Sequence, residues 1–269
     1  MTRPVPGTGT RLREVHAEWT KLRTAPGTLW TVLALVAVTV ATSAAASALV
    51  SCPSSGCGHD AVRIGLAGVQ AGQAVTAVAA VLAITGEYGT GMIRATFTAM
   101  PRRGAVLAAK AVVVAGLTLA SGTVAVLGSL LAARLVLPHS GFTPEHGFPP
   151  LSLADGPTLR AAAGSVLYLA LIALFSLGVA TAVRDSAAAA GVVLGLLYAL
   201  AAVPFVMVPD PDWQLLLWRI SPMNAGLAVQ STANLSALPL TPWQGVAVLT
   251  AWTAASLLLA ALLLRRRDA

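Results

Sequence analysis

The sequence predicts an all-α integral membrane protein with six transmembrane helices, both termini in the cytoplasm and an N-terminal interfacial helix. Composition is the first observation behind this fold class. Hydrophobic residues make up 57% of the 269 residues and charged residues only 10%, whereas a soluble globular domain has about 25% charged residues. The second observation is a set of six uncharged stretches, each long enough to cross about 30 Å of hydrocarbon. The third is the distribution of the basic residues between the stretches.

The six stretches contain no Asp, Glu, Lys, Arg or His. A helix satisfies all of its backbone groups internally, as lipid requires, and the stretches are too long and continuous for the short strands of an outer-membrane barrel. The expected spans are residues 28–50, 64–85, 111–133, 161–183, 186–208 and 243–264. They form a membrane domain over 28–264, between a tail at 1–27 and a basic tail at 265–269. The first stretch is longer than a signal-peptide core of about 7 to 15 residues and five more follow, so we expect it to remain as a span.

The basic residues predict the orientation. With the N-terminus inside, only four of the 17 lysines and arginines fall in outer segments, namely Arg63, Arg134, Arg160 and Arg219. The other thirteen lie on the cytoplasmic side, as the positive-inside rule predicts for a multi-pass protein of the cell membrane. The net charge of +7 therefore reflects topology and contact with anionic membrane lipids. No nucleic-acid-binding signature accompanies it, so we expect no nucleic-acid partner.

The segment before the first span, RLREVHAEWTKLRT, predicts the interfacial helix. Its apolar residues recur at helical spacing on one side, at Leu12, Val15, Trp19 and Leu22. Trp19 suits the headgroup level, and cations such as Lys21 suit lipid phosphate, so we expect a helix along the inner leaflet. The alternative is an exposed amphipathic tail.

The first outer loop holds the only two cysteines, Cys52 and Cys57. Disulfides persist on the outer side of a membrane, so a small disulfide-closed loop is the leading interpretation. A metal site with His59 would lack ligands. Two unpaired thiols are the remaining alternative.

No catalytic chemistry is evident in the sequence. The spans carry no ionisable group for proton coupling or hydrolysis, and a serine without a base within reach is not an activated nucleophile. The only lysines, Lys21 and Lys110, follow Thr20 and Ala109, so no phosphate-binding loop is present. We expect no enzyme activity, cofactor or metal in this chain, and any ATP hydrolysis must occur on another polypeptide.

A polar, basic loop at 86–110 interrupts the apolar stretches on the cytoplasmic side. Within it, TGMIRATFTAM predicts a short helix with Ile93, Phe97 and Met100 on one face and Arg94 beside them. Pro101 ends this helix. A short helix with an apolar face suits a groove on a soluble partner. The alternative is a solvated loop whose arginines contact lipid.

The loop sequence GEYGTGMIRATFTAMPRRGAVLAAK resembles the cytoplasmic loop of type-2 ABC transporter permeases, especially actinobacterial ones. The similarity lies in the Glu-Tyr pair, the Gly-Met-Ile-Arg core and the Pro-Arg-Arg turn before the third span. EWTKLRTAPGTLW at 18–30 and SPMNAG at 221–226 resemble the family at the entry to the first span and before the last. The six-span plan extends the resemblance over nearly the whole chain, although the second outer loop is longer than in the family.

The resemblance implies a permease subunit of an ABC exporter, paired with a second permease subunit (an identical copy or a paralogue) and with separate ATP-binding subunits. The loop would hold the coupling helix, and the helix around Trp19 would be the connecting helix. The residues expected to act in coupling are Glu87, Tyr88, Arg94, Phe97, Pro101, Arg102 and Arg103, with Trp19, Lys21 and Leu22 on the interfacial helix. A non-transporting membrane immunity or scaffold protein that binds its partner through the same loop is the alternative function.

Overall fold

The computed structural model describes residues 16, 18–21, 26–52, 57–89, 91 and 103–266. Every regular element in this part of the chain is helical. Six helices are long and apolar enough to cross a membrane, so the all-α, six-span fold class is confirmed. The long helices are α2 Pro26–Leu49, α4 Val69–Gly89, α6 Arg103–Val136, α7 Gly156–Val183, α8 Ser186–Leu194 with its continuation, and α12 Pro242–Arg266.

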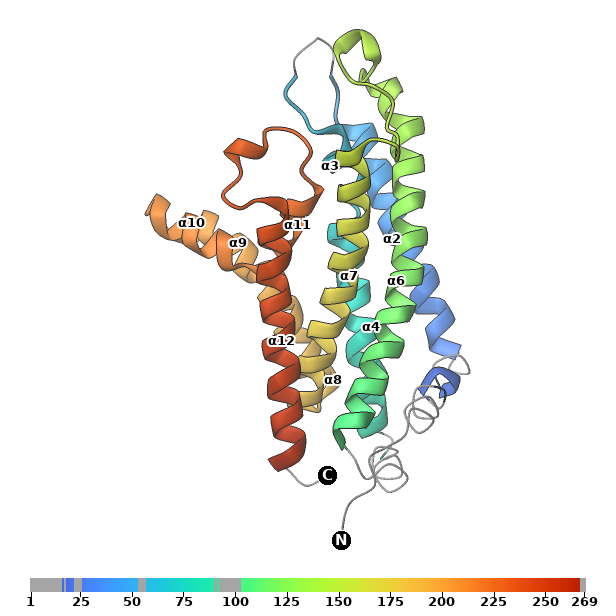
Figure 1. The fold of residues 1–269 in the computed structure, drawn as a ribbon, viewed down its shortest axis with the longest axis vertical. Coiled ribbons are helices and arrows are strands. Elements are labelled where there is room, and N and C mark those ends of the chain that lie inside the picture. The colour runs from blue at the N-terminus through green and yellow to red at the C-terminus, as the bar shows by residue number, and fades with distance from the viewer. Residues whose placement is uncertain are drawn as a thin grey trace.

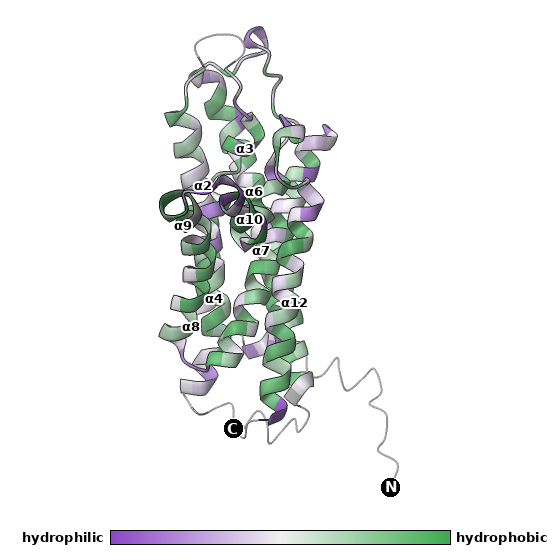
Figure 2. Cartoon of the chain, turned by 90° about the vertical axis from the view of Figure 1, so that its left-hand side faces the viewer, coloured by the Kyte–Doolittle hydropathy of each residue, from purple (hydrophilic) through white to green (hydrophobic). Residues whose placement is uncertain are grey.

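The long helices run side by side along one axis (Figure 1). The start of α2, the end of α4, the start of α6 and the end of α12 lie at one end, which we call the inner end because the basic residues predict it to be cytoplasmic. The opposite end is the outer end. Apolar residues cover the length of the helices, and polar residues gather toward the two ends (Figure 2). This is the distribution expected of a chain surrounded by lipid along its middle.

Helix α7 is the central helix of the bundle. It packs against α4, α6 and α12, and large side chains such as Tyr168, Leu169 and Phe175 are buried along it. Helix α2 lies at the periphery against α4 and α6. Many large apolar side chains on the peripheral helices are exposed, including Leu131 and Leu258. On a membrane protein these faces are the ones that lipid covers.

Helices α7 and α8 form a tight hairpin at the inner end. Arg184 ends α7 with a left-handed backbone conformation (φ 67°), and its N–H donates to the Ala180 carbonyl. Asp185 then begins α8, because its side chain accepts a hydrogen bond from Ala188 N–H. Two residues therefore reverse the chain between the fourth and fifth spans.

The fifth span is shorter than expected. The sequence predicts one continuous helix over 186–208, but the spanning stretch is Ser186–Val203. The helix passes through a π-helical turn, η3 Gly195–Ala199, before α9 Leu200–Met207. A π turn inserts a residue and redirects the helix axis, and α9 and α10 (Pro211–Ile220) lean away from the other helices (Figure 1).

Short elements cover the outer end. They are α3 Ala61–Gly65, α11 Pro222–Leu227 and the 3₁₀ turns η1 Leu137–Ser140, η2 Pro144–His146, η4 Ala228–Gln230 and η5 Leu235–Ala237. Residues 209–242 contain short helices. One of them, α11, is buried against α7 and α12. Cys52 and Cys57 form a disulfide with 5.9 Å between their Cα atoms, and the Cys52 N–H donates to the Ser140 carbonyl at 2.8 Å.

One of two Gly-x-x-x-Gly patterns in the sequence makes a close helix contact. The Cβ of an alanine at Gly68 would overlap the Thr39 carbonyl oxygen, and at Gly72 it would overlap the Thr39 hydroxyl. Gly68 N–H also donates to Ser43 Oγ at 3.0 Å. We call this α2–α4 contact the outer contact. Around Gly191 and Gly195 a Cβ would meet nothing within 4 Å.

Candidate functional site

Only some of the residues expected to act in coupling belong to the part of the chain that the structure describes. Glu87 and Tyr88 lie in the last turn of α4, so this helix extends beyond the expected end of its span at residue 85. Arg103 begins α6, and its side chain lies outside the described part. The remaining expected residues lie outside the described residues altogether, namely Leu22, Arg94, Phe97, Pro101 and Arg102.

Four charged side chains form a buried group at the inner end, which we call the inner cluster: Glu18, Lys21, Glu87 and Lys110. Lys110 Nζ lies 2.8 Å from Glu18 Oε2 and 3.0 Å from Glu87 Oε1. Lys21 Nζ lies 2.8 Å from Glu18 Oε1 and 3.3 Å from Glu87 Oε1. Each lysine thus bridges both glutamates. The cluster joins the segment before α2 to the end of α4 and the start of α6.

The inner cluster is withdrawn from solvent. Glu18 is 0% exposed, Lys110 2% and Glu87 6%, while the Lys21 side chain is 33% exposed. Taking charges out of water costs several kcal/mol per ion, and close opposite charges offset that cost only when their hydrogen bonds are well satisfied. The two acids and two lysines balance each other, which makes their burial possible.

Hydrogen bonding accounts for nearly every polar atom of the three deeply buried members. Lys110 Nζ donates to both glutamates and to the Ala83 carbonyl at 3.2 Å, which uses the three donors of an ammonium group. Both oxygens of Glu18 accept from a lysine. The exception is Glu87 Oε2, which is buried and has no hydrogen-bond partner among the described residues.

The pKa values of the two members outside the spans shift in opposite directions. Burial by itself raises the pKa of Glu18, but the ammonium groups of Lys110 and Lys21 outweigh it and hold the pKa below its ordinary value. Burial lowers the pKa of Lys21, but Glu18 and Glu87 outweigh it and the pKa is raised. The Glu18 contribution to stability is therefore complete above a glutamate's ordinary pKa of about 4.3 and is lost as the pH falls through the lower folded value. The Lys21 contribution is complete below about 10.4 and is lost as the pH rises through the higher folded value.

Tyr88 connects the end of α4 to the α7–α8 hairpin. The guanidinium carbon of Arg184 lies 5.6 Å from the centre of the Tyr88 ring, within the range of a cation–π interaction. The inner end of α4 therefore touches the segment before α2 through Glu87, and the fourth and fifth spans through Tyr88.

Trp19 is 43% exposed, and Glu18 beside it is fully buried. The structure corrects one expectation about charge. Glu87 and Lys110 were expected in a loop outside uncharged spans. They lie instead on α4 and α6, whose candidate spans run to Gly89 and from Gly104. A membrane helix can extend past its apolar run when its terminal charges are paired inside the bundle.

Sequence reasoning missed Glu18 and Lys110 as site residues. One signal was available, because the chain has only two lysines among 17 basic residues, and both belong to the inner cluster. Lys110 also sits within an otherwise apolar stretch, AVLAAKAVVVAG. A lone ammonium group in such surroundings requires an acidic partner.

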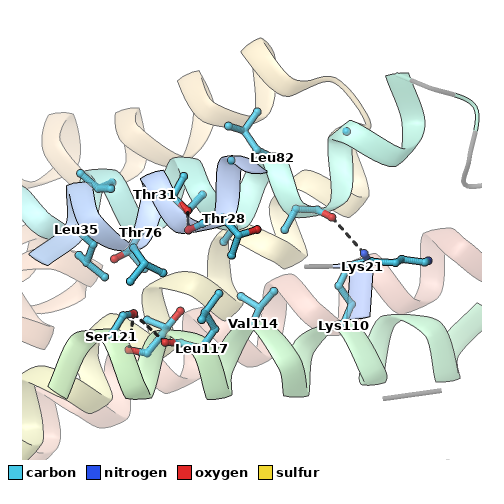
Figure 3. A pocket seen from close by; sticks show the side chains of 18 of the residues that line it. Lys21, Thr28, Thr31, Leu35, Thr76, Leu82, Lys110, Val114, Leu117 and Ser121 are labelled. Carbon is cyan, nitrogen blue, oxygen red and sulfur yellow. Dashed lines mark hydrogen bonds between the residues drawn. The ribbon is translucent and has the colours of Figure 1, made fainter. Parts of the chain in front are cut away.

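A cavity of about 320 Å³ adjoins the inner cluster. It lies between α2, α4 and α6, and side chains from all three helices surround it (Figure 3). All four members of the inner cluster line the cavity, and Lys21 and Lys110 lie at one end of it (Figure 3).

No protein-family model matches this chain, and no curated protein matches it either.

Proposed function

We propose that the chain is the membrane-spanning permease subunit of an ABC exporter in the cell membrane. In this proposal a separate ATP-binding subunit binds the cytoplasmic segment 86–110, and a second permease subunit completes the translocation path. Six candidate spans and the resemblance of the loop to type-2 permeases support it. No phosphate-binding loop occurs in the chain, so the energy source is assigned to the partner.

The inner cluster is the observation that carries the proposal. Glu87 is two residues before the end of α4, and Lys110 is in the second turn of α6, so the cluster lies at both ends of the segment expected to bind the ATPase. Both residues pair with Glu18 or Lys21 ahead of α2. A displacement of that segment would therefore act on α2, α4 and α6 together. Buried ion pairs are suited to this task because they fix a geometry more than they add stability.

The experiment is co-purification of the full chain with its candidate ATPase, followed by ATP hydrolysis measurements in vesicles. Arg94→Ala tests the loop, and Glu87→Ala tests its connection to the inner cluster. Both should lower the coupling between the subunits by roughly 5- to 150-fold, the usual range of coupling free energies, while membrane insertion stays normal. Arg134→Ala, an exposed cation at the outer end of α6, is the matched control and should leave coupling unchanged.

Unchanged coupling in both variants would remove the assigned role of the loop. Stable complex formation without any ATP-dependent movement of cargo would favour the immunity or scaffold function instead. Transport by the purified chain alone would contradict the proposal, because the energy would then not come from a partner.

A further inference from the structure

The cavity between α2, α4 and α6 has apolar walls despite the hydroxyl groups in its lining. Thr31 donates to the Thr28 carbonyl at 2.9 Å, Thr76 to Gly72 at 3.1 Å and Ser121 to Leu117 at 2.8 Å. These donors are therefore used within their own helices. The remaining wall residues include Leu35, Leu82 and Val114 (Figure 3). Such a wall favours an apolar chain over water, since a buried water needs two to four polar partners.

At the inner end of the cavity, one carboxylate oxygen of the inner cluster accepts no hydrogen bond from the residues that the structure describes. The ammonium group of Lys110 is fully used, and Glu18 accepts at both oxygens. Glu87 is 94% buried and keeps one free acceptor, Oε2. Oε2 is enclosed as the side chain stands, so a donor in the cavity would bond to it once Glu87 turns this oxygen inward, whereas a carboxylate or phosphate would be repelled by it. A positively charged donor gives the stronger bond to a carboxylate in a site of low dielectric constant.

The size of the cavity limits the size of a ligand that it can hold. A volume of about 320 Å³ lies at the small end of the roughly 300 to 1,000 Å³ of ligand pockets. From Lys110 to Ser121 the lining of α6 rises about 16 Å at about 1.5 Å per residue, which is about half of the hydrocarbon thickness. The cavity therefore suits one apolar chain that reaches from the inner headgroup level toward the middle of the membrane.

We propose that this cavity is a binding site for a single-chain amphiphile with a protonated amine, whose ammonium group donates to Glu87 Oε2 and whose apolar chain lies between α2, α4 and α6. The proposal concerns binding by this chain alone and does not depend on the transport role proposed above.

The test uses the full chain in nanodiscs of phosphatidylcholine and a dodecylamine probe with a photoreactive diazirine in its alkyl chain. Light-induced labelling should map to peptides of α2, α4 and α6 near the inner end. Unlabelled dodecylammonium should compete, and dodecanol and dodecanoate should compete roughly 10- to 100-fold less well, as expected for losing a charged hydrogen bond. Equal competition by the alcohol or the carboxylate would overturn the proposal, as would an absence of labelling at these helices.

Two variants separate the cavity from the lipid-facing surface. Ala79→Leu adds volume to the cavity wall, where Ala79 lies outside the inner cluster, and should abolish the competable labelling. Ala120→Leu, on an exposed face of α6, is its matched control and should not change it. Glu87→Gln should remove the preference for the amine over the alcohol. If Glu87→Gln does not fold, the two leucine variants decide the question, and equal labelling in both would overturn the proposal.

Discussion

The two ends of the α2–α4–α6 group are stabilised in different ways. Toward the outer end, Gly68 and Gly72 let α4 approach α2 closely, and the buried polar residues are neutral. At the inner end, α2, α4 and α6 separate around a cavity, and charged side chains join them. Close backbone contact fixes the outer contact, whereas pairs of long side chains hold the inner end. The difference indicates that relative motion of these helices would hinge near the outer contact and open the inner end.

A network of hydrogen bonds between uncharged side chains lies near the outer contact. Gln73 is fully buried. Its amide donates to Met223 Sδ at 2.9 Å, and its carbonyl oxygen accepts from the Tyr168 hydroxyl. Neutral hydrogen bonds of this kind contribute about 0.5–1.5 kcal/mol each. Losing one of them costs less than leaving a buried charge unpaired, so substitutions at the two ends should differ in magnitude.

The largest effect is expected from Lys110→Met. Among the described residues, the change leaves the buried Glu18 and Glu87 with Lys21 as their cation, and breaking a buried ion pair in this way costs roughly 3–5 kcal/mol. Unfolding of the full chain in detergent, followed by circular dichroism, measures the loss. Arg134→Met, an exposed cation on the same helix, is the control and should change stability by about 0.5 kcal/mol or less. Equal losses for the two variants would show that the inner cluster has no special role in stability.

A smaller effect is expected from Gly68→Ala. The new methyl group would meet the Thr39 backbone rather than a flexible side chain, and overpacking of this kind costs about 1–3 kcal/mol. The same unfolding measurement should show no loss for Gly191→Ala, where the space around the glycine is open and alanine favours the helix. A neutral result at both positions would mean that α2 and α4 do not approach closely at Gly68.

The smallest effect is expected from Tyr168→Phe. The variant removes only the hydroxyl that donates to Gln73, and it should cost about 0.5–1.5 kcal/mol. Tyr198→Phe is the matched control, because its hydroxyl donates to the Gln70 carbonyl at 2.6 Å from an exposed position. Its loss should be smaller, since this exposed hydrogen bond lies toward the outer end of the fifth span, where detergent headgroups and water can replace it. A cost for Tyr168→Phe as large as that of Lys110→Met would erase the distinction between the two ends.

Hydropathy predicted most of the fold, because the requirement for about 20 apolar residues per span is a strong constraint. Five of the six spans lie close to their expected positions, but the fifth is interrupted. Nothing in GVVLGLLYAL distinguishes a π turn from a regular helix, because the difference depends on tertiary contacts such as the one from Tyr198 to Gln70. Apolar composition places a helix in lipid but does not determine its direction.

The candidate site was only partly predictable from the sequence. Glu87 was expected to act there because the loop resembles that of the permease family, but its partners are 66 positions earlier, at Lys21, and 23 positions later, at Lys110. Charged residues close to a span are ordinarily solvated at the headgroup level. Only the folded arrangement shows that three of these charges are buried together.

The burial of Lys110 has a practical consequence for chemical probing of this molecule. Of its two lysines, one is 2% exposed and the other about one-third exposed, and both amines are held by carboxylates. Reagents that acylate or cross-link amines would thus find almost no reactive side chain on the closed inner end. Labelling of Lys110 by such a reagent would therefore measure how often the helices at the inner end separate and expose its amine.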